Sequence, residues 1–209
     1  MPTDTLDAPP WTAEHGGARS RRVVVAVFAA AAALVVLADQ LTKLYAVRVF
    51  AQAPVDLGFV RLVDVRNPNA AFSIPGFPGL FLAVTVVVCV LVARVLRRTE
   101  TPPLGLAYGM VVGGALGNAA DRVFRDPGFP AGAVVDWVAL GGFLDWFPVF
   151  NLADTAINIG AALLLLLLAR ADRRERDEVA KAAKAGPASV RPETRPPRSD
   201  RWPVGHDDA

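Results

Sequence analysis

Residues 134–160 read VVDWVALGGFLDWFPVFNLADTAINIG, and this stretch sets the requirements for the rest of the chain. It places two carboxylates, Asp136 and Asp154, in strongly apolar surroundings, the second at the start of a long apolar run. A charged group in such a place is costly unless it is paired or faces a wet cavity, so both are functional candidates. Two carboxylates a few ångströms apart share one proton and can activate a water molecule. The sequence therefore predicts a functional carboxylate pair if the remaining segments bring the two together.

The composition indicates an integral membrane protein. The chain has 209 residues, of which 53% are hydrophobic and only 20% charged, and its mean hydropathy is +0.37. The apolar residues fall in long unbroken runs, which soluble domains of this length avoid. The net charge of +2 comes from arginines at the ends of those runs. This pattern indicates membrane topology, and we expect no nucleic-acid partner.

The few cysteine and histidine residues exclude several kinds of site. The single cysteine, Cys89, lies inside an apolar run, and the two histidines, His15 and His206, lie in polar tails. The membrane part therefore has no histidine for a Ser-His-Asp triad, a Cys-His pair or a zinc site. We expect no metal and no cofactor, so hydrolytic chemistry would use carboxylates, lysine or a hydroxyl group.

Four apolar runs predict an all-α membrane protein. The expected transmembrane helices cover residues of about 22–46, 79–96, 103–121 and 149–169. Arginine clusters flank alternate ends of these runs, which places the N- and C-termini in the cytoplasm. An alternating segment at 59–65 predicts a small β-containing segment outside the membrane, on the extracytoplasmic side.

The tails differ in composition from the membrane part. Residues 1–20 are rich in Pro, Gly, Thr and charge and are expected to form a disordered cytoplasmic arm. Residues 21–170 form the expected four-helix domain. Residues 171–209 are rich in Arg, Pro and Ala and are expected to form a solvated cytoplasmic tail that begins as a helix.

With this topology the polar residues of the spans converge on one layer near the outer leaflet. Asn151, Asp154 and Asn158 are spaced by three and four residues and so share a helix face. The same spacing joins Gly114, Asn118 and Asp121 on the third span, and Asp39 and Lys43 on the first. In hydrocarbon such polar faces must meet one another.

Structural readings of these residues compete with functional ones. Asp39 with Lys43 fits an interfacial ion pair, and Asp121 with Arg122 fits a bracing salt bridge. Asn118 and Asn151 fit interhelical hydrogen bonds. Glycines in the third span, Gly113, Gly114 and Gly117, fit close helix packing. Asp145 fits a solvated loop carboxylate.

Five blocks of sequence resemble the signature blocks of the bacterial lipoprotein signal peptidase family, signal peptidase II. They are DQLTK (39–43), NPNAAF (67–72), GGALGNAADR (113–122), VVDW (134–137) and FNLADTAI (150–157), in the order of the family. The resemblance implies a multi-pass aspartyl endopeptidase of the bacterial cytoplasmic membrane, working near the outer leaflet. Such enzymes cut the signal peptide from prolipoproteins immediately before a cysteine that carries a diacylglyceryl group.

The resemblance also implies roles for individual residues. The catalytic aspartates of the family fall on Asp136 and Asp154. The supporting polar positions fall on Asp39, Lys43, Asn67, Asn118, Asp121, Arg122 and Asn151. Expected partners are prolipoproteins with a lipobox cysteine, membrane lipid and globomycin-type inhibitors, and the protein is expected to be a monomer.

Two departures from the family pattern leave alternatives open. Asn69 stands where the family usually has glycine, and the linker at 123–133 is several residues longer than in many members. The second departure keeps Asp121 as an alternative partner for Asp154. Readings from other classes are a serine/lysine protease using Ser73 and Lys43, a small proton-coupled transporter, and a scaffold protein.

Overall fold

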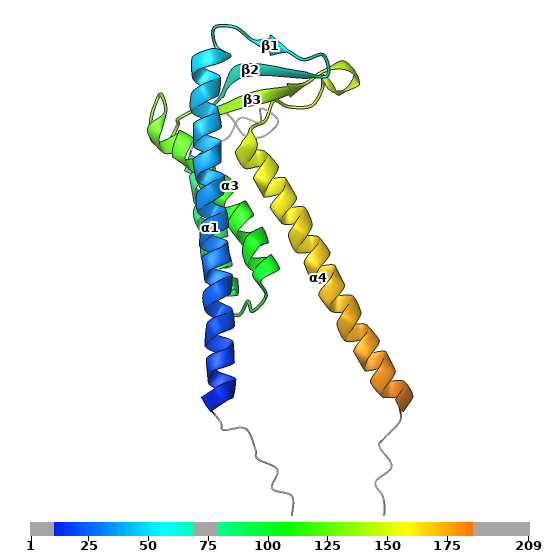
Figure 1. Cartoon of the computed structure of the whole chain (residues 1–209). Coiled ribbons are helices and arrows are strands. Elements are labelled where there is room, and N and C mark those ends of the chain that lie inside the picture. Colours follow the sequence, from blue (N-terminus) through cyan, green and yellow to red (C-terminus); the bar gives the residue numbers. More distant parts are fainter. Residues whose placement is uncertain (1–10, 69–78, 186–209) are drawn as a thin grey trace, which may run out of the picture. The chain divides into compact units, whose positions relative to one another are not determined.

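The computed structural model describes residues 11–68 and 79–185 (Figure 1). The chain divides into two compact units, residues 1–169 and residues 170–209. Within these described residues, the structure has four long helices, three strands and one short 3₁₀ helix. Their bounds are α1 Trp11–Val49, β1 Val55–Asp56, β2 Val60–Asn67, α2 Gly79–Leu96, α3 Pro102–Phe124, β3 Val134–Leu140, η2 Gly142–Leu144 and α4 Leu152–Ala185. Asn69 and Ser73, which the sequence analysis singled out, lie outside the described residues.

Three described helices are long and apolar enough to cross a membrane. They are Ser20–Val49, Gly79–Leu96 and Leu152–Lys184, and many of their large apolar side chains are exposed, as expected for surfaces that face lipid. The prediction of a mostly helical membrane protein is confirmed. The remaining expected span, the third along the chain, corresponds to α3, which carries Asn118, Asp121 and Arg122 and is not one of these three helices.

Two helices extend beyond the expected spans. The first begins at Trp11, so part of the segment expected to be disordered is helical in the structure. Within the second unit, Arg170–Ala185 continue α4 as a polar, exposed helix. On this helix Arg176 Nε lies 3.0 Å from Oδ2 of Asp172, which is one turn earlier. Both side chains of this ion pair are exposed.

Small residues allow α3 to lie directly against α1. A side-chain carbon built at Gly105, Gly109 or Gly113 would approach backbone oxygens of α1 to 2.6–2.8 Å, closer than real carbon atoms come. At Gly117 the same carbon would lie 2.6 Å from Asp39 Oδ2. The glycines therefore permit close packing, as the sequence analysis expected, and they leave room for a buried carboxylate.

A three-stranded antiparallel sheet in the order β1-β2-β3 lies at one end of α1 and α3 (Figure 1). The alternating segment forms β2 as predicted. Strand β3, which carries Asp136, was not anticipated, because its residues are buried on both faces and show no alternation. Its register with β2 sets Asp136 opposite Val65 and Val134 opposite Asn67.

Candidate active site

Helix α4 begins with a reciprocal cap that involves Asp154. The side-chain oxygen of Asn151 accepts from the backbone N–H of Asp154 at 3.0 Å, and Asp154 Oδ2 accepts from the backbone N–H of Asn151 at 3.1 Å. This is a capping box, in which the residue before the helix and its third residue satisfy each other's free N–H groups. The cap therefore fixes the Asp154 carboxylate at the start of α4.

A third backbone donor of this helix end is satisfied from another helix. Asp39 Oδ1 of α1 accepts from the N–H of Ala153 at 3.0 Å, and Asp39 is fully buried. A carboxylate is favourable here because the N-terminus of a helix carries partial positive charge. This bond joins α1 to the start of α4.

Asp136 is held through its backbone and its side chain. Its neighbour Trp137 donates its N–H to the carbonyl of Phe150 at 3.0 Å, which joins β3 to the residue before the α4 cap. The two carboxylate oxygens accept from amide groups, Asn151 Nδ2 at 2.7 Å and Asn67 Nδ2 at 3.0 Å. Asn151 thus contacts both candidate carboxylates.

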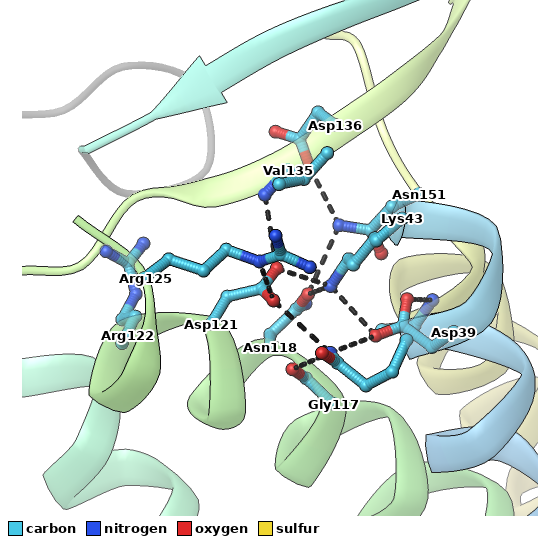
Figure 2. A network of polar contacts seen from close by, with 12 residues as sticks. Asp39, Lys43, Gly117, Asn118, Asp121, Arg122, Arg125, Val135, Asp136 and Asn151 are labelled. Atoms are coloured by element: carbon cyan, nitrogen blue, oxygen red, sulfur yellow. Dashed lines mark hydrogen bonds and ion pairs between the residues drawn. The ribbon is translucent and has the colours of Figure 1, made fainter. Parts of the chain in front are cut away.

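Asn118 extends this contact to the centre of the bundle (Figure 2). Its oxygen accepts from Asn151 Nδ2 at 3.1 Å and from Lys43 Nζ at 2.8 Å. Its Nδ2 donates to Asp154 Oδ1 at 2.8 Å. Both oxygens of Asp154 therefore accept N–H donors, one from α3 and one from the cap.

Lys43 uses all three of its N–H donors on oxygen atoms. Besides Asn118, the ammonium lies 2.8 Å from Asp39 Oδ2 and 2.9 Å from Asp121 Oδ2, and the three charged side chains are fully buried (Figure 2). The predicted Asp39–Lys43 ion pair is confirmed, but it is one edge of a larger network. A lysine saturated in this way holds helices together and has no free electron pair with which to act as a base.

Asp121 accepts four donors. Oδ1 accepts from Arg125 Nε at 2.6 Å and Gln40 Nε2 at 3.2 Å, and Oδ2 accepts from Lys43 and from the backbone N–H of Val135 at 3.1 Å. All of its lone pairs are thus occupied. This favours the bracing role over the alternative in which Asp121 is the partner of Asp154. Lys43 and Arg125 lie within ion-pair distance of Asp121, and Arg122, which the sequence analysis suggested, also interacts with it electrostatically.

Arg122 faces the sheet side of the site. Its guanidinium lies 4.6 Å from the centre of the Phe81 ring, and Nη1 lies 3.3 Å from the carbonyl of Gly132 and 3.5 Å from that of Pro68. The side chain is buried and lies close enough to interact electrostatically with Asp136. Arg122 therefore links the loop after β2 to the segment before β3.

One cavity of about 880 Å³ contains both candidate carboxylates. Its polar lining includes Asn67, Asn118, Arg122, Asp136 and Asp154. Its remaining wall is largely apolar and comes from α2, α3, α4, β3 and residues 147–150. Pockets of this size and character suit small or chain-like ligands that carry apolar groups. Both carboxylates are thus accessible to a ligand that enters between the helices.

Burial raises the pKa of Asp136 to about 6. The nearby charge of Asp154 acts in the same direction, while the amide groups of Asn67 and Asn151 and the charge of Lys43 lower the pKa. A carboxyl group with this pKa exchanges protons near neutral pH, as general acid–base chemistry requires.

All nine candidate site residues are brought together, and the sequence missed others. Hydrogen bonds and ion pairs connect eight of them: Asp39, Lys43, Asn67, Asn118, Asp121, Asp136, Asn151 and Asp154. Arg122 lines the same cavity and interacts electrostatically with Asp136. Gln40 and Arg125 were not foreseen. Their sequence signals are weak: Gln40 follows Asp39, and Arg125 lies four residues after Asp121, which is the spacing of a helical ion pair.

Comparison with known proteins gives a consistent result. The family model described as signal peptidase (SPase) II matches residues 31–170. The chain is 43% identical over 164 residues to a lipoprotein signal peptidase of Rhodococcus jostii, covering 77% of each chain. It is 36% identical over 180 residues to the protein of the same name in Mycobacterium tuberculosis, covering 80% of this chain and 85% of that one.

The fold also resembles a solved structure. A protein described as a bacterial membrane enzyme aligns with a TM-score of 0.60 and 27% identity, over 70% of this chain and 89% of that chain.

Proposed function

The chain belongs to the signal peptidase II family, and we propose that Asp136 and Asp154 are the carboxylate pair with which it cuts the signal peptide from prolipoproteins. The resemblance seen in the five sequence blocks is confirmed by the family match and by relatives named lipoprotein signal peptidase. The protein is thus an aspartic-type membrane endopeptidase. The observation that supports the pair best is that Asn151 donates to both carboxylates at the edge of one cavity.

The two carboxylates share one proton, so that one acts as a base while the other acts as an acid. The ionised one takes a proton from water as the water attacks the scissile carbonyl, and the protonated one donates its proton to the carbonyl oxygen. When the intermediate breaks down, the first gives the proton it received to the leaving amine, and the second takes its own proton back from the hydroxyl group. The proton is assigned to the pair, because the charge of Asp154 acts on Asp136.

The surrounding charges support a single shared proton. Lys43, Arg122 and Arg125 contribute three positive charges, and four aspartates face them: Asp39, Asp121, Asp136 and Asp154. One proton makes this group neutral. Neutrality is favoured where charges are buried away from water, since an uncompensated charge there is strongly disfavoured.

The remaining polar residues hold the pair in place. Asn118 and Asn151 orient Asp154, and Asp39, Lys43 and Asp121 brace α1, α3, α4 and β3 around it. Asn67 and Arg122 line the cavity, and their proposed role is to hold substrate backbone. The saturation of Lys43 argues against a serine/lysine protease.

The substrate enters from the lipid. The apolar wall of the cavity accepts the diacylglyceryl group of the lipobox cysteine, so that cleavage falls immediately before that residue. Four spans, with α3 included, put the basic helix ends and both termini in the cytoplasm and the site near the outer leaflet of the bacterial cytoplasmic membrane. The domain is residues 21–170, and it works as a monomer that globomycin-type compounds inhibit.

Cleavage by purified variants tests the assignment. A diacylglyceryl-modified prolipoprotein is incubated with wild type, Asp136→Asn, Asp154→Asn and Asp121→Asn, with and without globomycin. Loss of cleavage in the first two variants and residual cleavage in the third is expected. Full activity in Asp136→Asn, with inactive Asp121→Asn, would instead make Asp121 the partner of Asp154.

A further inference from the structure

Arg125 is the first residue after α3 and reaches back to the site. Its Nε lies 2.6 Å from Oδ1 of Asp121, one helical turn earlier, and the guanidinium is only 15% exposed. Arg125 does not appear in the lining of the cavity. It therefore touches the site through Asp121 and has no position from which to contact substrate there.

Asp121 transmits this contact to the strand that bears Asp136. Its Oδ2 accepts from the backbone N–H of Val135, the residue immediately before Asp136. Strand β2 lies along one edge of β3, while the N–H groups of Val135 and Trp137 bond to Asp121 and Phe150 at the other. The backbone around Asp136 is thus held by β2 at one edge and by Asp121 and Phe150, which lie outside the sheet, at the other.

The linker between α3 and β3 folds tightly onto the last turn of α3. The N–H of Gly132 donates to the carbonyl of Arg122 at 3.2 Å, and that of Gly128 donates to the carbonyl of Arg125 at 2.7 Å. A side-chain carbon at Gly132 would lie 2.5–2.8 Å from the carbonyls of Asp121, Arg122 and Arg125. Arg125 therefore contacts the linker through its backbone carbonyl and Asp121 through its side chain.

We propose that Arg125 is a positioning residue for signal-peptide cleavage, which fixes Asp121 and, through the Val135 amide, the location of Asp136. This rests on the proposed function of the Asp136–Asp154 pair. The charge of Arg125 also compensates part of the buried Asp121 carboxylate, which otherwise shares Lys43 with Asp39. Without Arg125, an excess negative charge near the pair favours proton binding there.

The test compares Arg125→Gln and Arg125→Lys with Arg176→Gln in the full-length protein. Arg176 makes the same ion pair to an aspartate four residues earlier, but on an exposed surface, so its loss is expected to leave cleavage unchanged. Steady-state cleavage of a diacylglyceryl-modified prolipoprotein is measured across pH, with thermal unfolding in the same detergent and Asp136→Asn as the inactive reference.

Arg125→Gln is expected to lower kcat roughly 10-fold to 100-fold, as a small misplacement of a reacting group does, with KM within about twofold because no cavity contact is lost. Its pH profile should move upward by about half a unit, and Arg125→Lys should recover part of both changes. An Arg125→Gln protein that matches Arg176→Gln in kcat and pH profile would overturn the inference, as would a loss of thermal stability with an unshifted profile. Cleavage by Asp136→Asn would instead overturn the assigned pair.

Discussion

Asn151 Nδ2 lies 2.7 Å from Asp136 Oδ1, while the backbone N–H of Asn151 donates to Asp154 Oδ2 at 3.1 Å. One residue therefore caps α4 and spaces the two carboxylates. The spacing depends on where the helix starts, because Asp154 is the third residue of α4 and Asn151 the residue before it. Asn151 therefore both starts the helix and positions the proposed catalytic pair.

Asn151→Ala is expected to lose both functions. Removing a cap residue lowers the free energy of unfolding by about 0.5–2 kcal/mol, and removing the bridge to Asp136 should lower kcat by roughly 100-fold. Asn151→Ser separates the two effects, because serine caps a helix well but is too short to bridge. Serine should restore stability and leave cleavage low. Equal cleavage by Asn151→Ser and wild type would show that the bridge is unnecessary.

Lys43→Met should destabilise the protein strongly. It leaves two buried carboxylates, Asp39 and Asp121, without their shared cation, and breaking a buried ion pair from one side costs about 3–5 kcal/mol. Replacing both aspartates by asparagine in the same protein should recover much of this loss, which unfolding in detergent would measure. Lys181→Met removes an exposed pair with Glu178 and should have little effect. Similar losses in the two single variants would contradict the buried network.

Asp136→Asn should stabilise the folded protein in a pH-dependent way. The folded-state pKa of Asp136, about 6, lies above the ordinary value of 3.8, so the folded state binds its proton more tightly. Between these two values the wild-type protein loses stability as pH rises, and above about pH 6 the loss is complete. Asparagine has no such loss. The midpoint of thermal unfolding should therefore exceed that of wild type by a few degrees at pH 8, with the difference shrinking toward pH 4.

The control for this prediction is an exposed carboxylate. The Asp145 side chain is 63% exposed and lies 3.6 Å from the exposed Arg61, and exposed ion pairs contribute little to stability, so Asp145→Asn should have an unfolding midpoint close to that of wild type. A stability difference for Asp136→Asn that stayed constant from pH 4 to pH 8 would contradict the assigned pKa direction.

The sequence predicted which residues come together better than it predicted the contacts between them. Helical spacing was sufficient to place Asn118 and Asp121 on one face and to predict that polar faces meet, because periodicity and the exclusion of charge from hydrocarbon act locally. The ion pair of Asp39 and Lys43 followed from the same rule.

Contacts between segments far apart in the chain could not be predicted from the sequence. Strand β3 pairs with β2 about seventy residues earlier, and its register depends on the bulge between Leu62 and Val65, which no local pattern encodes. The bonds from Asp39 to Ala153 and from Asp121 to Val135 join a side chain to a backbone amide. Backbone donors carry no residue identity, so a sequence pattern cannot indicate them.

Gly117 leaves the space that Asp39 occupies, and Gly117→Ala should therefore disturb the site from a distance. The added carbon would lie 2.6 Å from Asp39 Oδ2, and that carboxylate binds Lys43 and the start of α4. Such overpacking costs about 1–3 kcal/mol, and displacement of Asp39 should also lower kcat several-fold because α4 carries Asp154. Gly79→Ala is the matched control, since nothing lies within 4 Å of its added carbon; it should be neutral or slightly stabilising in a helix. Normal cleavage and stability in Gly117→Ala would show that Asp39 can move freely, which the buried network forbids.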